Sequence, residues 1–210
     1  IYQLMALKQQ HPKEMEQAAA LLMIPDYFHY RLCGAKVQEY SEATTSQLVN
    51  PATRDWDYEL IDRLGYNRAM FQKICMPGTD IGGLTTEVQE LVGYDCRVVL
   101  PPTHDTASAV MAVPTNEDDI CYMSSGTWSL MGVERADADC SEQSREANFT
   151  NEGGYRGRIT YLTNIMGLWM IQSVRGQLAP DLSYGELCGL ASRETIETVV
   201  DCQDARFLSP

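Results

Sequence analysis

An acidic residue stands where an apolar strand gives way to a helix of small residues, and it is the strongest chemical signal in the chain. The run CRVVL (96–100) predicts a buried strand that ends at Pro101 and Pro102, because proline has no amide hydrogen to donate. Asp105 then opens a helix expected over 104–113. The helix dipole favours the anionic form of Asp105, and an ionised carboxylate can accept a proton from a substrate hydroxyl during phosphoryl transfer. Taken alone, the residue is explained more simply as a helix cap.

A glycine turn between two predicted strands is the second candidate site. The segment YMSSGTWSLMG (122–132) predicts strands over 120–125 and 127–134, joined at Gly126 with Thr127 beside it. Glycine allows a ligand to approach the backbone closely, and successive turn amides form a cradle for phosphate oxygens. Neutral donors of this kind would suit an acidic protein that binds a phosphorylated ligand such as ATP. On this motif alone, an ordinary serine–glycine turn is the simpler explanation.

Two amide side chains accompany a predicted amphipathic helix over 165–178. Asn164 is suited to cap this helix, or to donate a hydrogen bond to a sugar hydroxyl or a phosphate. Gln172 is expected on the same side, with Leu168 between the two amides. A solvated polar stripe explains the pair as well as a binding role does.

Other residues near these motifs are interpreted as structural. His104 precedes the candidate base and can contact a sugar, but a lone histidine is more often part of the scaffold. Glu152 is interpreted as a turn residue. Trp169 is expected in the core, as are Cys96 and Cys121, which lie in predicted strands.

Composition narrows the class of protein. The net charge is −13 with only 16 Lys and Arg, so nucleic acid and anionic membrane surfaces are not expected as partners. Apolar runs fall short of the roughly 20 residues that cross a bilayer. The seven cysteines form no CxxC pair, which argues against a protein-held metal site and for reduced thiols in the cytoplasm. P-loop, Rossmann and α/β-hydrolase motifs are absent.

The N-terminal part predicts mostly short helices, and the remainder mixes strands with helices. A polar link over 114–119 is expected to separate two domains. Asp26 and Asp57 are predicted helix caps, and Thr86 is preferred to Thr85 as the cap of a later helix. Helices are expected over 12–24, 26–33, 41–48, 57–65, 67–74, 85–93 and 183–194, further strands over 148–154, 156–164 and 199–202, and a surface loop over 136–146.

Taken together, the motifs resemble those of the FGGY family of carbohydrate kinases. The resemblance rests on THDTASAV (103–110), YMSSGTWSLMG (122–132), NFTNEGG (148–154) and LTNIMGLWMIQ (162–172), and extends to RDWDYELIDRLG (54–65). It spans nearly the whole chain, with the motifs in the family's order. The pair SSGTWSLMG and NIMGLW is similar to the branch of the family that phosphorylates L-rhamnulose.

The resemblance implies an α/β protein with the actin-like ATPase (ribonuclease H-like) fold. Residues 1–113 would be the C-terminal part of the first domain, and residues 119–210 the N-terminal part of a second, nucleotide-binding domain. Sugar and ATP, with Mg²⁺, would meet between the domains, giving L-rhamnulose 1-phosphate and ADP. The implied roles are general base for Asp105, sugar contacts for His104, Thr106 and Asn164, phosphate binding for Gly126 and Thr127, and a nucleotide contact for Gln172.

Three segments of the family pattern have no counterpart in the chain, one of them an early glycine-bearing segment that binds the sugar. The DxGxxxxR loop that binds phosphate and magnesium would precede Ile1, and the glycine motif that binds adenosine would follow Pro210. We therefore expect a fragment of a longer kinase that is inactive by itself. Two alternatives stay open: an FGGY kinase for another sugar (xylulose, fuculose or glycerol), and a non-catalytic actin-like module.

Overall fold

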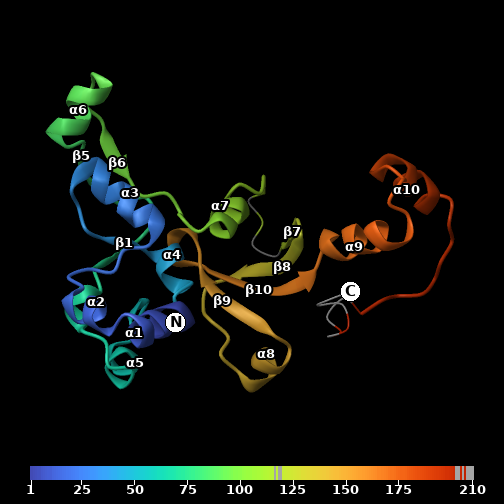
Figure 1. Cartoon of the computed structure of the whole chain (residues 1–210), viewed down its shortest axis with the longest axis horizontal. Helices are drawn as coiled ribbons and strands as arrows, with labels where there is room; N and C mark the ends of the chain where they lie inside the picture. Colours follow the sequence, from blue (N-terminus) through green and yellow to red (C-terminus); the bar gives the residue numbers. More distant parts are fainter. Residues whose placement is uncertain (116, 118–119, 202–203, 205, 207–210) are drawn as a thin grey trace.

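A four-stranded antiparallel sheet forms the centre of the computed structural model, which describes residues 1–115, 117, 120–201, 204 and 206. One helix, α7 (Asp105–Met111), lies over this sheet (Figure 1). The strand order is β7–β8–β10–β9, and every neighbouring pair is antiparallel. The strands are β7 (Cys121–Ser125), β8 (Trp128–Arg135), β9 (Phe149–Gly153) and β10 (Ile159–Met166).

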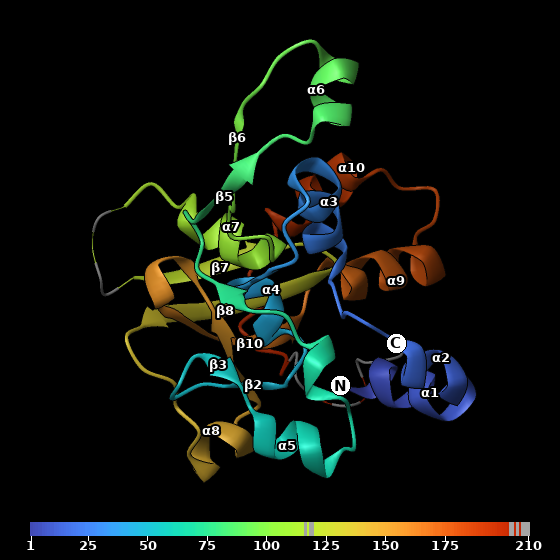
Figure 2. The same ribbon diagram turned by 90° about the vertical axis from the view of Figure 1, so that its left-hand side faces the viewer.

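The N-terminal part packs short helices and two-stranded sheets around a core that includes Trp56, Ile61 and Phe71. In Figure 2, this N-terminal part faces the viewer and lies in front of the central sheet. The helical elements are α1 (Tyr2–Gln10), α2 (Pro12–Gln17), α3 (Ile24–Cys33), α4 (Tyr40–Thr44), α5 (Tyr58–Arg63), η1 (Arg68–Met70) and α6 (Thr86–Val92). The strand pairs are β1 (Gln38–Glu39) with β4 (Ile74–Cys75), β2 (Val49–Asn50) with β3 (Asp55–Trp56), and β5 (Asp80–Gly83) with β6 (Arg97–Val99).

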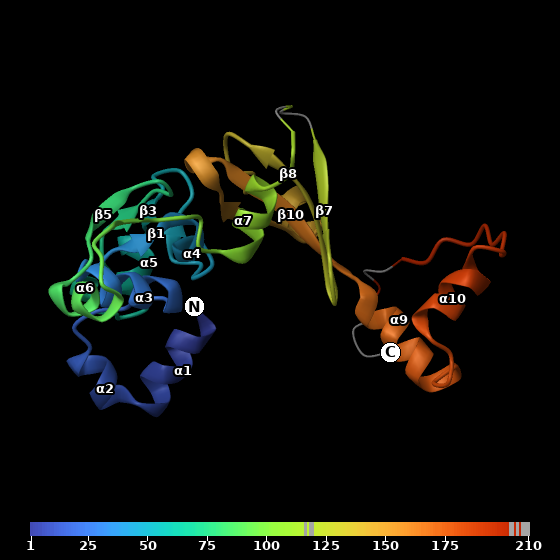
Figure 3. The ribbon, with the colours of Figure 1, turned by 90° about the horizontal axis from the view of Figure 1, so that it is seen from above.

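The C-terminal helices project beyond the end of the central sheet (Figure 3). These are α9 (Leu168–Leu178) and α10 (Tyr184–Ala191), while α8 (Glu142–Glu146) and η2 (Tyr155–Gly157) lie beside the other strands. Trp169 is 41% exposed, so its predicted place in the core is wrong: α9 leaves the sheet at this point. A bilayer-spanning helix, long and apolar enough, does not occur within the described ranges.

Two predicted helices are shorter than expected, because their ends pair with distant backbone. The helix expected over 12–24 ends at Gln17, and Leu21 instead donates its amide hydrogen to Met70 O at 2.7 Å. The helix expected over 67–74 is reduced to η1, since β4 pairs in parallel with β1. The predicted loop 136–146 contains α8, which Ser141 caps. No strand forms over 199–201, and Cys202 lies outside the described residues.

Of the three predicted helix caps, one is confirmed. Asp57 caps α5 by accepting the Leu60 amide hydrogen at 2.9 Å. The cap of α6 is Thr85 rather than Thr86, because the Thr85 hydroxyl accepts from Val88 N. The core placement of Cys96 and Cys121 is wrong, since both are exposed. The strand expected over 96–100 is likewise buried only at alternate positions, because only one face of β6 is covered.

A buried carboxylate in α3 predicts how stability depends on pH. Asp26, expected as a cap, lies inside the first turn of α3 and is fully buried. One of its oxygens accepts the Glu39 amide hydrogen at 2.9 Å, and the other has no hydrogen-bond partner. Burial raises the pKa of Asp26 from 3.8 to about 7. The folded state therefore binds this proton more tightly than the unfolded state, and stability falls as pH rises from 4 through 7.

Asp26→Asn should therefore increase the free energy of unfolding at pH 8 by a few kcal/mol, at about 1.4 kcal/mol per pKa unit. At pH 4 the variant and the parent should be nearly equal, because Asp26 is neutral there. Urea unfolding at the two pH values measures this difference. Asp62→Asn, on an exposed aspartate in α5, is the control. Equal stability of the Asp26 variant and the parent at pH 8 would contradict the prediction.

Candidate active site

The predicted base lies at the first residue of α7 and is open to solvent. The side chain of Asp105 is 96% exposed. Its Oδ1 accepts the Thr106 amide hydrogen at 2.7 Å and faces the Thr106 hydroxyl at 3.4 Å. His104, with extended backbone, occupies the N-cap position instead, and α7 has no side-chain cap. Because Thr106 and Ala107 are buried, the helix start is fixed while the carboxylate stays available to a ligand.

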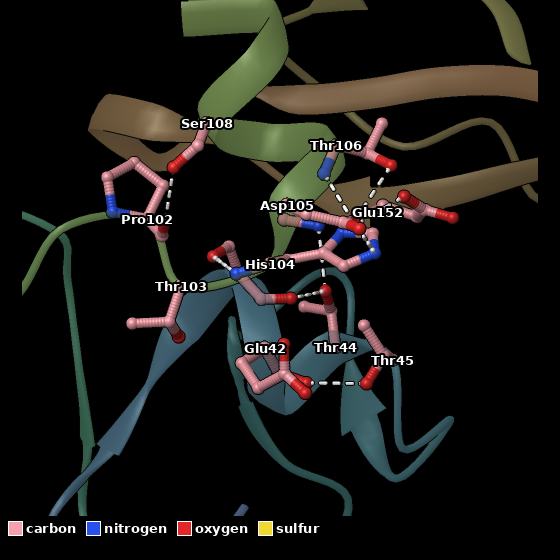
Figure 4. Close-up of polar contacts among 12 residues, drawn as sticks. Glu42, Thr44, Thr45, Pro102, Thr103, His104, Asp105, Thr106, Ser108 and Glu152 are labelled. Atoms are coloured by element: carbon pink, nitrogen blue, oxygen red, sulfur yellow. Dashed lines mark hydrogen bonds and ion pairs between the residues drawn. The ribbon is translucent and has the colours of Figure 1, made fainter. Parts of the chain in front are cut away.

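The imidazole of His104 lies between two carboxylates from different parts of the chain (Figure 4). Its Nε2 is 3.6 Å from Asp105 Oδ1, and its Nδ1 is 3.4 Å from Glu152 Oε2. Burial raises the pKa of Glu152, and the nearby His104 opposes that shift. Burial also raises the pKa of Glu42, again against the effect of His104. His104 is therefore set in a local acidic environment at the start of α7.

Glu152 was misread from sequence as a turn residue, and it belongs to β9. Its strand neighbour Gly153 explains how β9 comes so close to α4. The Gly153 amide hydrogen is donated to Thr44 Oγ1 at 2.8 Å. A Cβ on Gly153 would lie 2.7 Å from the Tyr40 ring and 2.9 Å from Thr44 Cγ2. Only glycine therefore fits between β9 and α4, and this close contact places Glu152 against His104.

The predicted phosphate-binding turn joins β7 to β8 and rests on the start of α9. Within the turn, Gly126 N donates to Trp128 O at 2.9 Å. The carbonyl oxygens of Gly126 and Thr127 accept the amide hydrogens of Leu168 and Trp169, at 2.9 and 3.2 Å. Thr127 is exposed. The turn is thus held by its backbone, and the Thr127 side chain stays accessible.

Asn164 does not begin a helix, so the predicted amide stripe does not exist. Asn164 lies in β10 opposite Leu130, and the residue at the N-cap of α9 is Gly167. The prediction failed because β10 stays paired with β8 as far as Met166. Gln172 is exposed on α9.

The register of β10 shows which candidate residues share a surface. Glu152 pairs with Thr160, and Asn164 follows four residues later along β10. Alternate strand residues point to one face, so Asn164 and Glu152 lie on the same side of the sheet. Met166 pairs with Trp128, six residues beyond Thr160, which corresponds to about 20 Å along the strand. The structure therefore groups His104, Asp105 and Thr106 at one end of the sheet and Gly126 and Thr127 toward the other.

Comparison with known proteins identifies the family. Residues 1–112 match the N-terminal domain, and residues 121–209 the C-terminal domain, of the FGGY family of carbohydrate kinases. A rhamnulokinase of Halalkalibacterium halodurans is 50% identical over 210 residues, which are 100% of this chain and 45% of the relative. A rhamnulokinase of Oceanobacillus iheyensis is 49% identical over 210 residues, which are 100% of this chain and 44% of that relative. The chain thus spans less than half the length of these curated relatives.

Solved structures agree on the fold. A ligand-bound xylulose kinase from Lactobacillus acidophilus has a TM-score of 0.82 at 21% identity, covering 92% of this chain and 39% of that one. A Plasmodium falciparum glycerol kinase with ADP has a TM-score of 0.75 at 13% identity, and the match covers 92% of this chain and 40% of that one. These likenesses bear out the predicted actin-like kinase fold. The chain belongs to the FGGY family of carbohydrate kinases.

Proposed function

We propose that this chain forms part of a kinase that transfers the γ-phosphoryl group of ATP to the 1-hydroxyl of L-rhamnulose. The main support is the exposed Asp105 carboxylate beside His104, in a chain 50% identical to a rhamnulokinase over all 210 residues. The products would be L-rhamnulose 1-phosphate and ADP. We place the reaction in the cytoplasm, in keeping with the free thiols of the described cysteines.

Asp105 would act as the general base. Its carboxylate accepts the proton of the sugar hydroxyl as the phosphoryl group arrives in line. Thr106 is buried, and its amide nitrogen donates to the Asp105 carboxylate. It would therefore affect the sugar indirectly, by orienting that carboxylate. His104 and Asn164 would hydrogen-bond other sugar hydroxyls. Asn164 suits this role because it is exposed on the sheet face that runs from Glu152 toward the β7–β8 turn.

The β7–β8 turn would hold the nucleotide. Gly126 and Thr127 would bind phosphate oxygens, and Gln172 on α9 would contact the rest of the nucleotide. Because the turn and Asp105 lie toward opposite ends of the sheet, transfer would require the γ-phosphate to extend from the turn toward Asp105. Mg²⁺, when bound, would neutralise phosphate charge. In the described ranges no three His, Cys, Asp or Glu side chains come together as a metal site.

A chimera tests the proposal: these 210 residues replace the matching 45% of the Halalkalibacterium halodurans rhamnulokinase, giving what we call the chimeric kinase. ADP release is measured with L-rhamnulose, xylulose, fuculose and glycerol. We expect the highest kcat/KM with L-rhamnulose. A folded chimera that prefers another of these sugars would reassign the substrate, and one that phosphorylates none would favour a non-catalytic module.

By itself, the 210-residue chain should show no micromolar ATP binding in calorimetry.

A further inference from the structure

A buried carboxylate below the active site accepts hydrogen bonds from two separate segments. Glu39 is fully buried at the end of β1. Its Oε1 accepts from Ser41 N at 2.8 Å, and its Oε2 accepts from Glu42 N at 3.1 Å and from Ser41 Oγ. The same Oε2 also accepts from Thr103 N at 3.0 Å and Thr103 Oγ1 at 2.8 Å. One side chain thus joins the start of α4 to the segment that leads into α7.

The segment before Asp105 is held by further contacts of the same kind. Ser41 Oγ, which donates to Glu39, accepts the His104 amide hydrogen at 3.2 Å. From the other side, Ser108 Oγ in α7 donates to Pro102 O. The three residues immediately before Asp105 are therefore each fixed by a hydrogen bond, two of them through Glu39 or its partner Ser41.

We propose that Glu39 is a positioning residue, which sets where the Asp105 carboxylate stands by fixing the backbone of Thr103 and His104. The inference rests on the proposed role of Asp105 as base. Asp105 itself is almost fully exposed, so packing around its side chain does not fix its position. Its place therefore depends on the backbone on both sides, the buried start of α7 and the segment that precedes it. A displacement of about 1 Å at a reacting group can cost about 10²-fold in rate.

An ionised carboxylate suits this position better than an amide. A carboxylate accepts at both oxygens, whereas glutamine accepts at one and donates at the other. Donors face both oxygens of Glu39, so either orientation of a glutamine would set its NH₂ group against at least one N–H. One orientation would lose the contact to Ser41 N at the start of α4. The other would lose the contact to Glu42 N and the backbone contact to Thr103.

The competing explanation is that Glu39 only caps α4. The two explanations separate at Thr103, which takes no part in the cap. Thr103→Val removes the hydroxyl donor to Glu39 Oε2 and leaves the Ser41 and Glu42 contacts in place. Thr103→Ser keeps the hydroxyl. Thr79→Val is the matched control, because the half-buried Thr79 hydroxyl donates to Met76 O, outside the active site.

The experiment measures kcat, KM for ATP and thermal stability in the chimeric kinase. Thr103→Val should lower kcat about 10-fold with KM for ATP unchanged, and Glu39→Gln should lower it up to about 100-fold. Thr103→Ser should restore kcat, and Thr79→Val should cost comparable stability without changing kcat. The Glu39→Gln and Thr103→Val effects should be less than additive, since both release the same segment.

Several outcomes would overturn the positioning role. If Thr103→Val keeps normal kcat while Asp105→Asn abolishes turnover, Glu39 is only a cap, and the proposed function stands. If Asp105→Asn also keeps normal turnover, it is the function that fails. Should Glu39→Gln not fold, the Thr103 series decides by itself. If Thr103→Val and Thr79→Val lower kcat by the same factor, the loss reflects a general fall in stability, and the proposal is also rejected.

Discussion

Asp105→Asn should lower kcat of the chimeric kinase by about three orders of magnitude, because general base catalysis contributes about 10²–10⁴-fold. Asparagine keeps the shape of the side chain and can still accept the hydrogen bond from Thr106 N, which lies 2.7 Å from Oδ1 of Asp105. It cannot take the proton of a sugar hydroxyl. The loss should therefore appear in kcat with L-rhamnulose, while KM for ATP stays unchanged.

A matched control separates the loss of the base from the loss of a surface charge. Asp62→Asn removes an exposed carboxylate that pairs with Arg68. Asp62 lies in α5, far from α7 along the chain. Its kcat should equal that of the parent. Steady-state kinetics of both variants at saturating ATP make the comparison. Near-normal turnover of Asp105→Asn would remove Asp105 from the role of base.

Local sequence signals were enough to place the main candidate residues. Asp105 was expected at the start of a helix of small residues that follows a strand, and it is the first residue of α7, after β6. The turn at Gly126 was expected between two strands, and it joins β7 to β8. In both cases the determining residues are neighbours along the chain, so glycine, proline and strand-forming runs reveal the element directly.

Residues that act through distant partners were missed for the opposite reason. Glu39 contacts Thr103 across a separation of 64 residues. Nothing in the residues around Glu39 indicates that a carboxylate there is buried. Glu152 meets His104 only because Gly153 allows β9 to approach α4. The strand expected over 148–154 would have placed the Glu152 side chain on one face of a sheet, but not opposite a histidine.

Errors in the predicted elements have the same physical origin. Apolar periodicity continued from β10 into α9, so the helix was expected to begin at 165, and Asn164 was taken as its cap. The structure keeps residues 159–166 in a strand, because β8 supplies a hydrogen-bonded partner along that whole length. The backbone partner of a segment, which decides between strand and helix here, is not visible in the segment itself.

Gly167→Ala should destabilise the β7–β8 turn and weaken nucleotide binding. Gly167 separates β10 from α9, and a Cβ there would lie 2.6 Å from Gly126 O and 2.8 Å from Ser129 N. Both are backbone atoms, which cannot turn aside as the end of a side chain can. Forcing such an overlap costs about 1–3 kcal/mol. The strain falls on the turn that presents Thr127, so KM for ATP in the chimeric kinase should rise about 10-fold, the equivalent of 1.4 kcal/mol.

Gly176→Ala in the same helix is the control. A Cβ on Gly176 meets no atom within 4 Å, so alanine fits without strain. Because alanine favours a helix over glycine by about 1 kcal/mol, this variant should be as stable as the parent or more stable, with unchanged KM for ATP. Thermal unfolding of the two variants and ATP titration of their kinetics give the comparison. If Gly167→Ala and Gly176→Ala behave alike in both measurements, α9 does not support the turn, and Gly126 and Thr127 lose their proposed part in binding phosphate.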